Sequence, residues 1–160
     1  MSFKTLKSDW AFIILATLVF VIGLAVAVWD FIQLQKAFWS LGLLNGLGLA
    51  AFVGGFVLRQ VGKRTLGRSY SYGLRTLEYQ KLVQHGVYRY IRHPITLAAL
   101  IYTPAMPLVL SSMYGFLVML LIFPLFLYRT GIEEKMLIEK FGREYTQYME
   151  KTKRFIPFIY

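Results

Sequence analysis

Long stretches without a charged residue alternate along this chain with short stretches that are dense in charge. Three charge-free runs stand out, at residues 10–29, 37–58 and 94–128. A helix needs about 20 residues to cross a hydrocarbon core of about 30 Å, so each of the first two runs predicts one membrane span. The charged stretches between them then predict the loops outside the membrane.

The third run is too long for one crossing. Its 35 residues would form a helix about 52 Å long at ~1.5 Å per residue. We therefore predict a hairpin of two spans at about 94–110 and 115–128, which turns at 110–115 where two serines and a glycine cluster. Each arm is slightly short, so tight packing, tilt or local thinning is expected. Prolines inside the arms predict kinked helices that face protein: Pro104, Pro107 and Pro124.

Composition supports an all-α, multi-pass integral membrane protein. Hydrophobic residues make up 57% of the 160 residues and charged residues only 16%, which is too apolar for an ordinary soluble domain. Cysteine is absent, which excludes disulfides and thiolate metal sites. With two histidines in the whole sequence, we predict no metal site.

The charge distribution predicts the orientation. The segment 59–93 holds eight Lys and Arg residues against one Glu, and residues 129–160 hold seven against five Glu. Cytoplasmic loops carry such an excess, so four spans with both termini in the cytoplasm satisfy every loop. The membrane would be the inner membrane of a prokaryote or the endoplasmic reticulum of a eukaryote. We attribute the net charge of +10 to this topology and to anionic lipids, with no nucleic-acid partner.

Small residues in the second span predict close helix packing. Gly42 and Gly46 lie one helical turn apart, and Gly48, Gly54 and Gly55 add further small positions. Asn45 in the same span is predicted to form a hydrogen bond between helices. We expect these residues to serve packing, not catalysis.

Polar side chains suited to chemistry are confined to two cytoplasmic stretches. The first contains "LVQHGVYRYIRHP", and the second contains "EEKMLIEKFGREYTQY" followed by "RFIP". The second predicts a helix that continues from the membrane, with apolar residues spaced 4, 4 and 3 apart: Leu137, Phe141, Tyr145 and Tyr148. Arg129 and Glu133 lie one turn apart at the interface, which on its own predicts an ion pair.

Together these stretches resemble the isoprenylcysteine carboxyl methyltransferase family and the related membrane phospholipid methyltransferases. The resemblance covers about Tyr79 to Pro157, half of the chain, whereas the first two spans match only in hydrophobicity. It implies a membrane enzyme that uses S-adenosyl-L-methionine as methyl donor. It places the cofactor motif at 79–96 and 129–157. Because the sequence shows no internal repeat, low-complexity tract or separate soluble domain, we predict one domain over residues 1–160.

The resemblance also implies which residues form the site. One wall of the cofactor pocket comprises Gln80, Lys81, Leu82, Val83 and Tyr88, and another comprises His93, Pro94, Ile95 and Thr96. Glu133 would reach the cofactor, and Arg129 would bind the methyl acceptor. The family often has His at the position of Gln80 and Tyr at that of Thr96.

The chemistry of the donor agrees with these roles. Its carboxylate suits Arg92 and His93, its positive charge suits Glu133 or Glu134, and a tyrosine, Tyr88 or Tyr90, suits its ring or its charge. Pro94 would begin the third span, where a missing N–H costs nothing.

A prenylcysteine carboxylate or similar lipid-like acceptor needs alignment more than acid or base catalysis. A lipid amine would need a proton acceptor, for which Glu133, Glu134 and His85 are candidates. Two alternatives remain open: an NADPH-dependent membrane reductase, because sterol reductases resemble the same Arg-His-Pro stretch, and a non-catalytic membrane protein.

Overall fold

The described part of the chain is all-helical. A computed structural model describes residues 3–34, 42–70 and 81–155, and no β-strand forms within them. The helices are α1 (Phe3–Leu34), α2 (Leu43–Leu66), α3 (Pro94–Val109), α4 (Met113–Met119), α5 (Ile122–Phe141) and α6 (Arg143–Lys151). Two short 3-10 helices lie between α2 and α3: η1 (Gly67–Ser69) and η2 (Gly86–Arg89).

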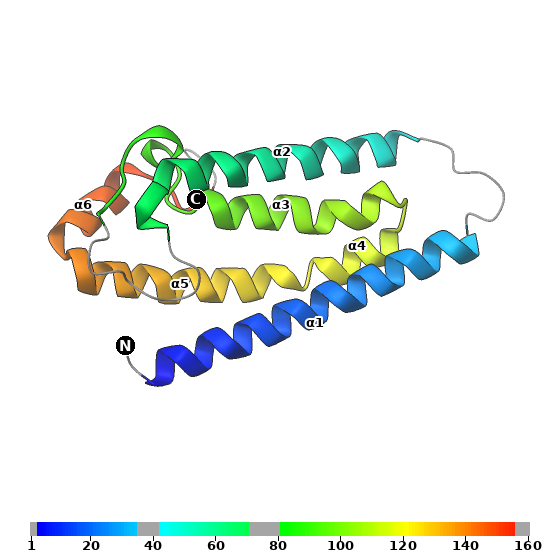
Figure 1. The fold of residues 1–160 in the computed structure, drawn as a ribbon, viewed down its shortest axis with the longest axis horizontal. Coiled ribbons are helices and arrows are strands. Elements are labelled where there is room, and N and C mark those ends of the chain that lie inside the picture. Colours follow the sequence, from blue (N-terminus) through cyan, green and yellow to red (C-terminus); the bar gives the residue numbers. More distant parts are fainter. Residues whose placement is uncertain (1–2, 35–41, 71–80, 156–160) are drawn as a thin grey trace.

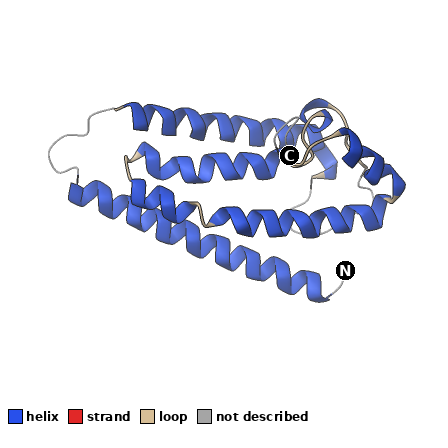
Figure 2. Ribbon diagram, turned by 180° about the vertical axis from the view of Figure 1, so that it is seen from behind, coloured by secondary structure: helices blue, strands red, loops and turns tan. Residues whose placement is uncertain are grey.

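The long helices lie side by side (Figure 1). α2 packs against α3, α3 packs against α4 and α5, and α1 packs against α4 and α5. The start of α1, the end of α2, η2 and α6 lie at one end of the bundle, and the turn between α3 and α4 lies at the other, as the view from behind also shows (Figure 2). A small buried core of Leu100, Ile122 and Phe155 joins α3, α5 and the segment after α6.

Three stretches are long and apolar enough to cross a membrane: Asp9–Gln33, Leu43–Ser69 and Met113–Phe141. They correspond to the first, second and fourth predicted spans, but all three extend beyond the predicted bounds, because helix continues through the flanking charged residues. The second begins at Leu43, not at residue 37, and residues 37–41 lie outside the described part. The 16-residue α3 covers only about 24 Å at ~1.5 Å per residue, so the count of four crossings stays a prediction.

The predicted helical hairpin is confirmed, with its turn at residues 110–112. Ser111 adopts a left-handed backbone conformation with φ 57°, which reverses the chain. The Ser112 hydroxyl caps α4 by accepting a hydrogen bond of 2.9 Å from the Gly115 N–H, and it donates one of 2.5 Å to Asp30 of α1. Gly115 itself lies in α4 and faces α1 so closely that a Cβ at this position would come 2.9 Å from Cβ of Ala27.

Proline shapes the hairpin in two ways. Pro104 and Pro107 are buried inside α3, as predicted for a helix that faces protein. Pro124 is exposed, contrary to that prediction. It lies in the first turn of α5, and since it has no N–H for the carbonyl of Leu120, the helix is interrupted between α4 and α5.

The predicted C-terminal helix is broken at Gly142. Its φ of 54° is a conformation that favours glycine, and the chain turns there from α5 into α6. α6 is amphipathic and buries Tyr145 and Tyr148. The sequence pattern is consistent with one continuous helix, so it could not show this turn.

Close packing of α2 on α3 depends on three glycines spaced seven residues apart. A Cβ at Gly48, Gly55 or Gly62 would come within 2.8–2.9 Å of α3. The predicted close packing is thus confirmed at Gly48 and Gly55. Gly46, in contrast, has open space around it, so the face predicted from Gly42 and Gly46 is wrong. The face of α2 that packs against α3 lies about half a helical turn away from Gly46.

The prediction for Asn45 is confirmed. Its amide group donates hydrogen bonds to the Val109 carbonyl at 2.8 Å and to the Ser111 hydroxyl at 2.6 Å. Its side-chain oxygen accepts one of 3.1 Å from the Gly42 N–H at the start of α2. One buried amide thus ties α2 to the hairpin turn.

Candidate functional site

A cavity of about 470 Å³ lies at the end of the bundle where η2 and α6 are found. Its walls come from the segment 81–93, the starts of α1 and α3, the end of α2, and α5 and α6. The volume falls within the range of roughly 300–1,000 Å³ that is usual for small-molecule sites.

The cavity gathers most of the predicted site residues, although they are far apart in the sequence. Ten of them line it: Lys81, Leu82, Val83, Tyr88, Arg92, His93, Ile95, Thr96, Arg129 and Glu133. Pro94 does not line the cavity. It is fully buried as the first residue of α3, which confirms its predicted position in the first turn. Gln80 lies outside the described residues.

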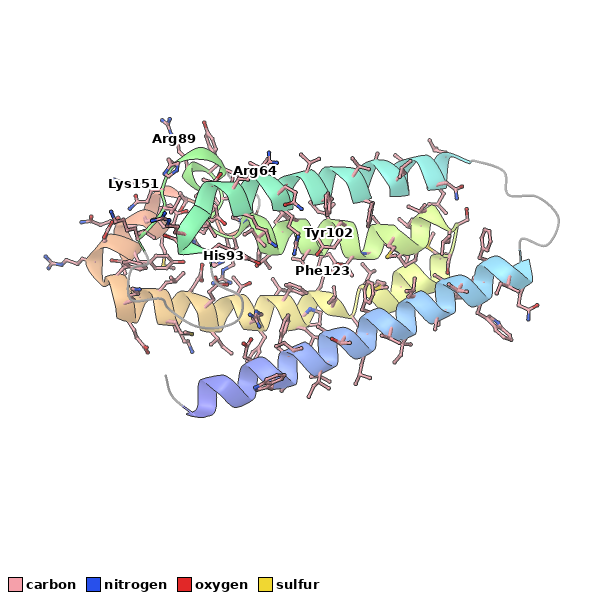
Figure 3. The ribbon with its side chains drawn as sticks, in the orientation of Figure 1. Arg64, Arg89, His93, Tyr102, Phe123 and Lys151 are labelled. Carbon is pink, nitrogen blue, oxygen red and sulfur yellow. The ribbon has the colours of Figure 1, made fainter. Side chains whose placement is uncertain are left out.

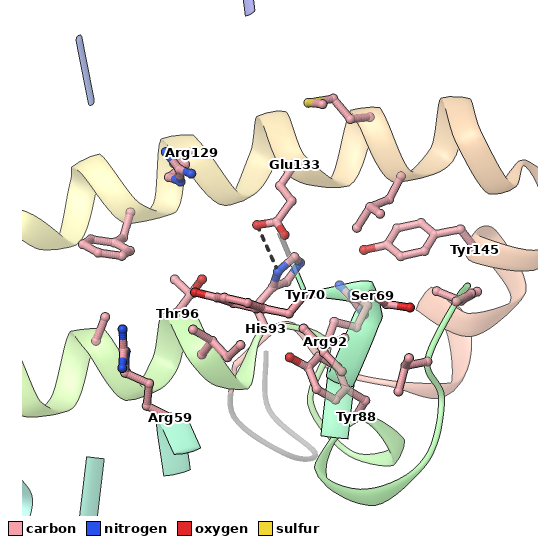
Figure 4. A pocket seen from close by; sticks show the side chains of 18 of the residues that line it. Arg59, Ser69, Tyr70, Tyr88, Arg92, His93, Thr96, Arg129, Glu133 and Tyr145 are labelled. Atoms are coloured by element: carbon pink, nitrogen blue, oxygen red, sulfur yellow. Dashed lines mark ion pairs between the residues drawn. The ribbon is translucent and has the colours of Figure 1, made fainter. Parts of the chain in front are cut away.

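His93 lies between two carboxylates from consecutive residues of α5. Its Nδ1 is 3.7 Å from Oε2 of Glu133, and its Nε2 is 3.2 Å from Oε1 of Glu134. Glu133 projects toward the cavity and its side chain is 44% exposed, whereas the Glu134 side chain is only 5% exposed (Figure 4). Glu133 is therefore the carboxylate that a ligand can reach.

Glu134 instead joins the two motif stretches. It contacts Nε of Arg92 at 3.0 Å and also forms an ion pair with Arg154. The Arg92 guanidinium also donates hydrogen bonds to the carbonyls of Met149, at 3.1 Å, and Thr152. These contacts hold the segment after α6 against the wall of the cavity.

Backbone pairing reinforces this connection. Ile91 and Lys153 form a parallel bridge. The Arg92 N–H donates to the Lys153 carbonyl at 2.8 Å, and the His93 N–H donates to the Arg154 carbonyl at 3.2 Å. The position of the Arg-His-Pro stretch is thus set by residues about sixty positions later in the chain.

Three tyrosines form a neutral polar wall. The Tyr148 hydroxyl donates a hydrogen bond of 2.6 Å to the Tyr88 carbonyl, and the rings of Tyr145 and Tyr148 pack edge to face at 5.9 Å. Burial raises the pKa of Tyr148 to about 12, and burial also raises the pKa values of Tyr88 and Tyr145. The buried Tyr145 hydroxyl has no hydrogen-bond partner among the described residues and points toward the interior of the site (Figure 4).

Arg129 does not form the ion pair with Glu133 that spacing alone predicts. Its guanidinium forms an ion pair with Asp9 of α1 and lies 4.5 Å from the ring centroid of Phe12. These contacts bring the start of α1 to the cavity. The apolar part of the wall lies beside them, between α1, α3 and α5, and comprises Phe12, Ile13, Ala99, Tyr102 and Phe126.

Some predicted candidates lie outside the cavity, and some lining residues were missed. His85 and Tyr90 are exposed and do not line it. Arg59, at the edge of the second apolar run, lines the cavity although the sequence analysis did not single it out. Its position directly after a predicted span, where a charged side chain can face a cavity between helices, was the one signal that could have revealed it.

The profile of the phospholipid methyltransferase family matches residues 43–144. A protein of Oryza sativa subsp. indica named "Probable protein-S-isoprenylcysteine O-methyltransferase" is 33% identical over 128 residues, which are 78% of this chain and 65% of the rice protein. Protein-S-isoprenylcysteine O-methyltransferase B of Arabidopsis thaliana is 28% identical over 148 residues, which are 91% of this chain and 73% of that protein.

A solved structure has a similar fold. The eukaryotic intramembrane Ras methyltransferase ICMT (isoprenylcysteine carboxyl methyltransferase) superposes with a TM-score of 0.75 at 25% sequence identity, over 87% of this chain and 52% of that one. This chain thus spans about half the length of that enzyme and 65% of the rice relative. The resemblance seen in the two motif stretches is confirmed. Since the family profile extends from α2 to the start of α6 and includes most of the cavity wall, the chain belongs to the phospholipid methyltransferase family.

Proposed function

We propose that this chain is an integral membrane methyltransferase that transfers a methyl group from S-adenosyl-L-methionine to a lipid-like acid, an S-isoprenylcysteine carboxylate or a similar acceptor. One observation carries the proposal. A single cavity has a charged end around His93 and Glu133 and continues into an apolar end between α1, α3 and α5. The names of the relatives, which specify methyl transfer to isoprenylcysteine, support this choice of acceptor.

The residues at the charged end fit the donor. S-adenosyl-L-methionine carries a carboxylate, an ammonium, a sulfonium and an adenine ring. His93 and Arg92 suit its carboxylate and Glu133 suits a positive group, while the tyrosine rings suit the adenine. The buried Tyr145 hydroxyl lacks a partner among the described residues, and a polar ligand would satisfy it. We therefore assign the donor to this end.

Lys81, Leu82, Val83, Ile95 and Thr96 would complete the walls around the donor, together with Tyr88. We assign the apolar end to the acceptor chain, with Arg129 at the boundary between the two ends. When bound, the donor supplies a methyl group whose bond to sulfur breaks, with its electron pair left on sulfur, as the acceptor oxygen bonds to the methyl carbon. An acceptor carboxylate is already ionised at neutral pH, so the residues of the site need to align it and exclude water, not remove a proton.

We further propose that the site faces the cytoplasm, with four crossings and both termini on that side. Basic residues gather at the end of the bundle that holds the site, among them Arg64, Arg89 and Lys151 (Figure 3). Cytoplasmic segments carry such an excess. α6 would then lie at the cytoplasmic surface, and the short α3 would cross where its neighbours or a thinned bilayer accommodate it.

Ligand-dependent stability tests the proposal. In detergent-solubilised protein, S-adenosylhomocysteine should raise the melting temperature in a concentration-dependent way, because it binds only the folded state. NADPH should have no effect. Stabilisation by NADPH and not by S-adenosylhomocysteine would favour a membrane reductase, and stabilisation by neither would favour a non-catalytic protein.

A further inference from the structure

The contacts of α1 with the rest of the bundle change along its length. In its second half, α1 packs so closely on α4 that a Cβ at Gly23 would come 2.9 Å from Cγ of Met119. Toward its start, α1 diverges from α5 (Figure 1). Long side chains connect the two helices there, and among them Asp9 of α1 forms an ion pair with Arg129 of α5. This ion pair thus lies where the two helices are further apart.

Exposed aromatic residues place the Asp9–Arg129 pair at the level of the lipid headgroups. Its chain neighbours, Trp10 and Tyr128, are both exposed. Such side chains gather where a membrane meets water. Trp29, which is also exposed, lies about 28 Å further along α1 at ~1.5 Å per residue, close to the ~30 Å of a hydrocarbon core. The two tryptophans therefore fit the two boundaries of the membrane, and the ion pair lies at one of them.

An arginine at this depth attracts anionic phospholipids unless a carboxylate compensates it. The planar guanidinium matches a phosphate as well as it matches a carboxylate. The apolar end of the cavity begins beside Arg129, at Phe12, Ile13 and Phe126, and offers room for an acyl chain. A phospholipid has an anionic group next to a hydrophobic chain, as the proposed acceptor has. A site for a lipid-like acid therefore needs a means of excluding the anionic lipids around it.

The contacts of Arg129 differ between its two sides. Arg129 lines the cavity, whereas Asp9 does not, so Asp9 pairs with the guanidinium from outside the cavity, on the side of α1. The Phe12 ring lies 4.5 Å from Cζ of the same guanidinium. The Asp9 and Arg129 side chains are 14% and 18% exposed, so water and salt screen the pair little. One side of Arg129 is thus covered by α1, and the other faces the cavity.

We propose that Asp9 is a specificity-determining residue that shields Arg129 from the phosphate groups of anionic phospholipids. The inference rests on the proposed function, in which Arg129 lies beside the acceptor. A lipid that approaches past α1 meets the negative charge of Asp9 before it reaches Arg129, whereas a ligand inside the cavity reaches Arg129 without displacing Asp9. The site thus excludes phospholipid by the position of one carboxylate and still admits an acid.

Acid binding in bilayers with and without anionic lipid tests this role. The full chain is placed in nanodiscs of phosphatidylcholine, or of phosphatidylcholine mixed with phosphatidylglycerol, and titrated with N-acetyl-S-farnesylcysteine. Wild-type affinity should differ by less than about threefold between the two bilayers. Asp9→Asn should keep its affinity in the neutral bilayer and lose at least about tenfold in the anionic one, because phosphatidylglycerol then competes for Arg129.

Matched variants separate this role from folding and from net charge. Asp9→Ser, a second uncharged side chain, should be as sensitive to phosphatidylglycerol as Asp9→Asn, and Asp9→Glu should match wild type because it keeps the charge. Glu150→Gln changes the net charge equally but removes an exposed acid of α6 that does not line the cavity, so it should also match wild type. S-adenosylhomocysteine should bind every variant equally in the two bilayers, which shows that each is folded.

An equal effect of phosphatidylglycerol on Asp9→Asn and on wild type or Glu150→Gln would overturn the role of Asp9. Tighter acid binding by Asp9→Asn in both bilayers would overturn it too, since Asp9 would then neutralise Arg129 toward every anion alike. If wild type in neutral nanodiscs binds neither S-adenosylhomocysteine nor the acid, the proposed function itself fails.

Discussion

The two ends of the cavity differ in how many of their basic side chains are paired with carboxylates. Near α6, Glu134 contacts three basic side chains in a buried cluster: Arg92, His93 and Arg154. At the end near α1, Arg129 pairs with an acid from another helix, and Arg59 has no ion pair with any described residue. One end has its charges satisfied within the fold, and the other has an excess.

The most deeply buried charges are the Arg92–Glu134 pair, and the most accessible carboxylate beside them is Glu133. The Arg92 and Glu134 side chains are 9% and 5% exposed, so each needs a partner within the protein. The Arg129 side chain is 18% exposed and that of Glu133 is 44% exposed, so water or a ligand can reach them. The buried Arg92–Glu134 pair thus maintains the architecture, with help from Arg154, which is 26% exposed, whereas Glu133 remains accessible to a ligand.

Removing the charge of Glu134 should have the largest effect. Glu134→Gln leaves two arginines without their carboxylate, and breaking a buried pair in this way costs about 3–5 kcal/mol. We expect a lower melting temperature in detergent even without ligand. Glu139→Gln, an exposed position on the same helix, should change stability by less than about 0.5 kcal/mol. Equal melting temperatures for the two variants would refute the architectural role.

Arg129→Lys tests the end of the cavity near α1. Lysine keeps the charge but lacks the planar fork that aligns a carboxylate, so methyl transfer should fall by about a hundredfold. S-adenosylhomocysteine affinity should stay within a few-fold. Initial rates and calorimetric titration measure the two quantities.

Asp9→Asn is the matched control for Arg129→Lys. It removes the charge of the α1 partner and leaves the guanidinium in place. If it reduced turnover as much as Arg129→Lys does, the role of Arg129 would be to hold α1 and not to bind the acceptor. A parallel loss of donor affinity in Arg129→Lys would move Arg129 to the donor site.

Glu133→Gln should have the smallest effect of the three. The protein should keep its melting temperature, because this carboxylate is accessible, and should bind S-adenosylhomocysteine about tenfold more weakly. A larger loss for S-adenosyl-L-methionine than for S-adenosylhomocysteine would place Glu133 near the sulfonium. Unchanged affinity for both would remove Glu133 from the donor site.

The helices and the reversal of the chain between α3 and α4 could be predicted from the sequence, whereas the breaks within the helices could not. Run length and the two serines predicted the hairpin, which Ser111 and Ser112 form. The break before α5 and the turn at Gly142 depend on single residues within patterns that continue on both sides. Which glycines of α2 pack was also not predictable, because several faces of the helix carry small residues and only contact with α3 selects one of them.

The motif residues of the site were predicted, but the residues that oppose them were not. Glu133 and Glu134 are adjacent and point about 100° apart on a helix; residue chemistry alone left both open, whereas the motif resemblance named Glu133, which does line the cavity. Asp9 and Arg59 lie outside the two motif stretches, so no motif marked them, although the family profile extends over Arg59 as well. Long-range packing determines both assignments.

The pairing of residues 91–93 with 152–154 has a consequence for synthesis. One wall of the cavity leaves the ribosome about sixty residues before the segment that supports it, which is a delay of roughly 3–12 s at ~5–20 residues per second. The hydrophobic helices can enter the bilayer during that interval. If the cavity holds the donor as proposed, the donor can stabilise only a chain that has been synthesised past residue 154, and a product truncated after α5 should insert in the membrane and yet fail to bind the donor.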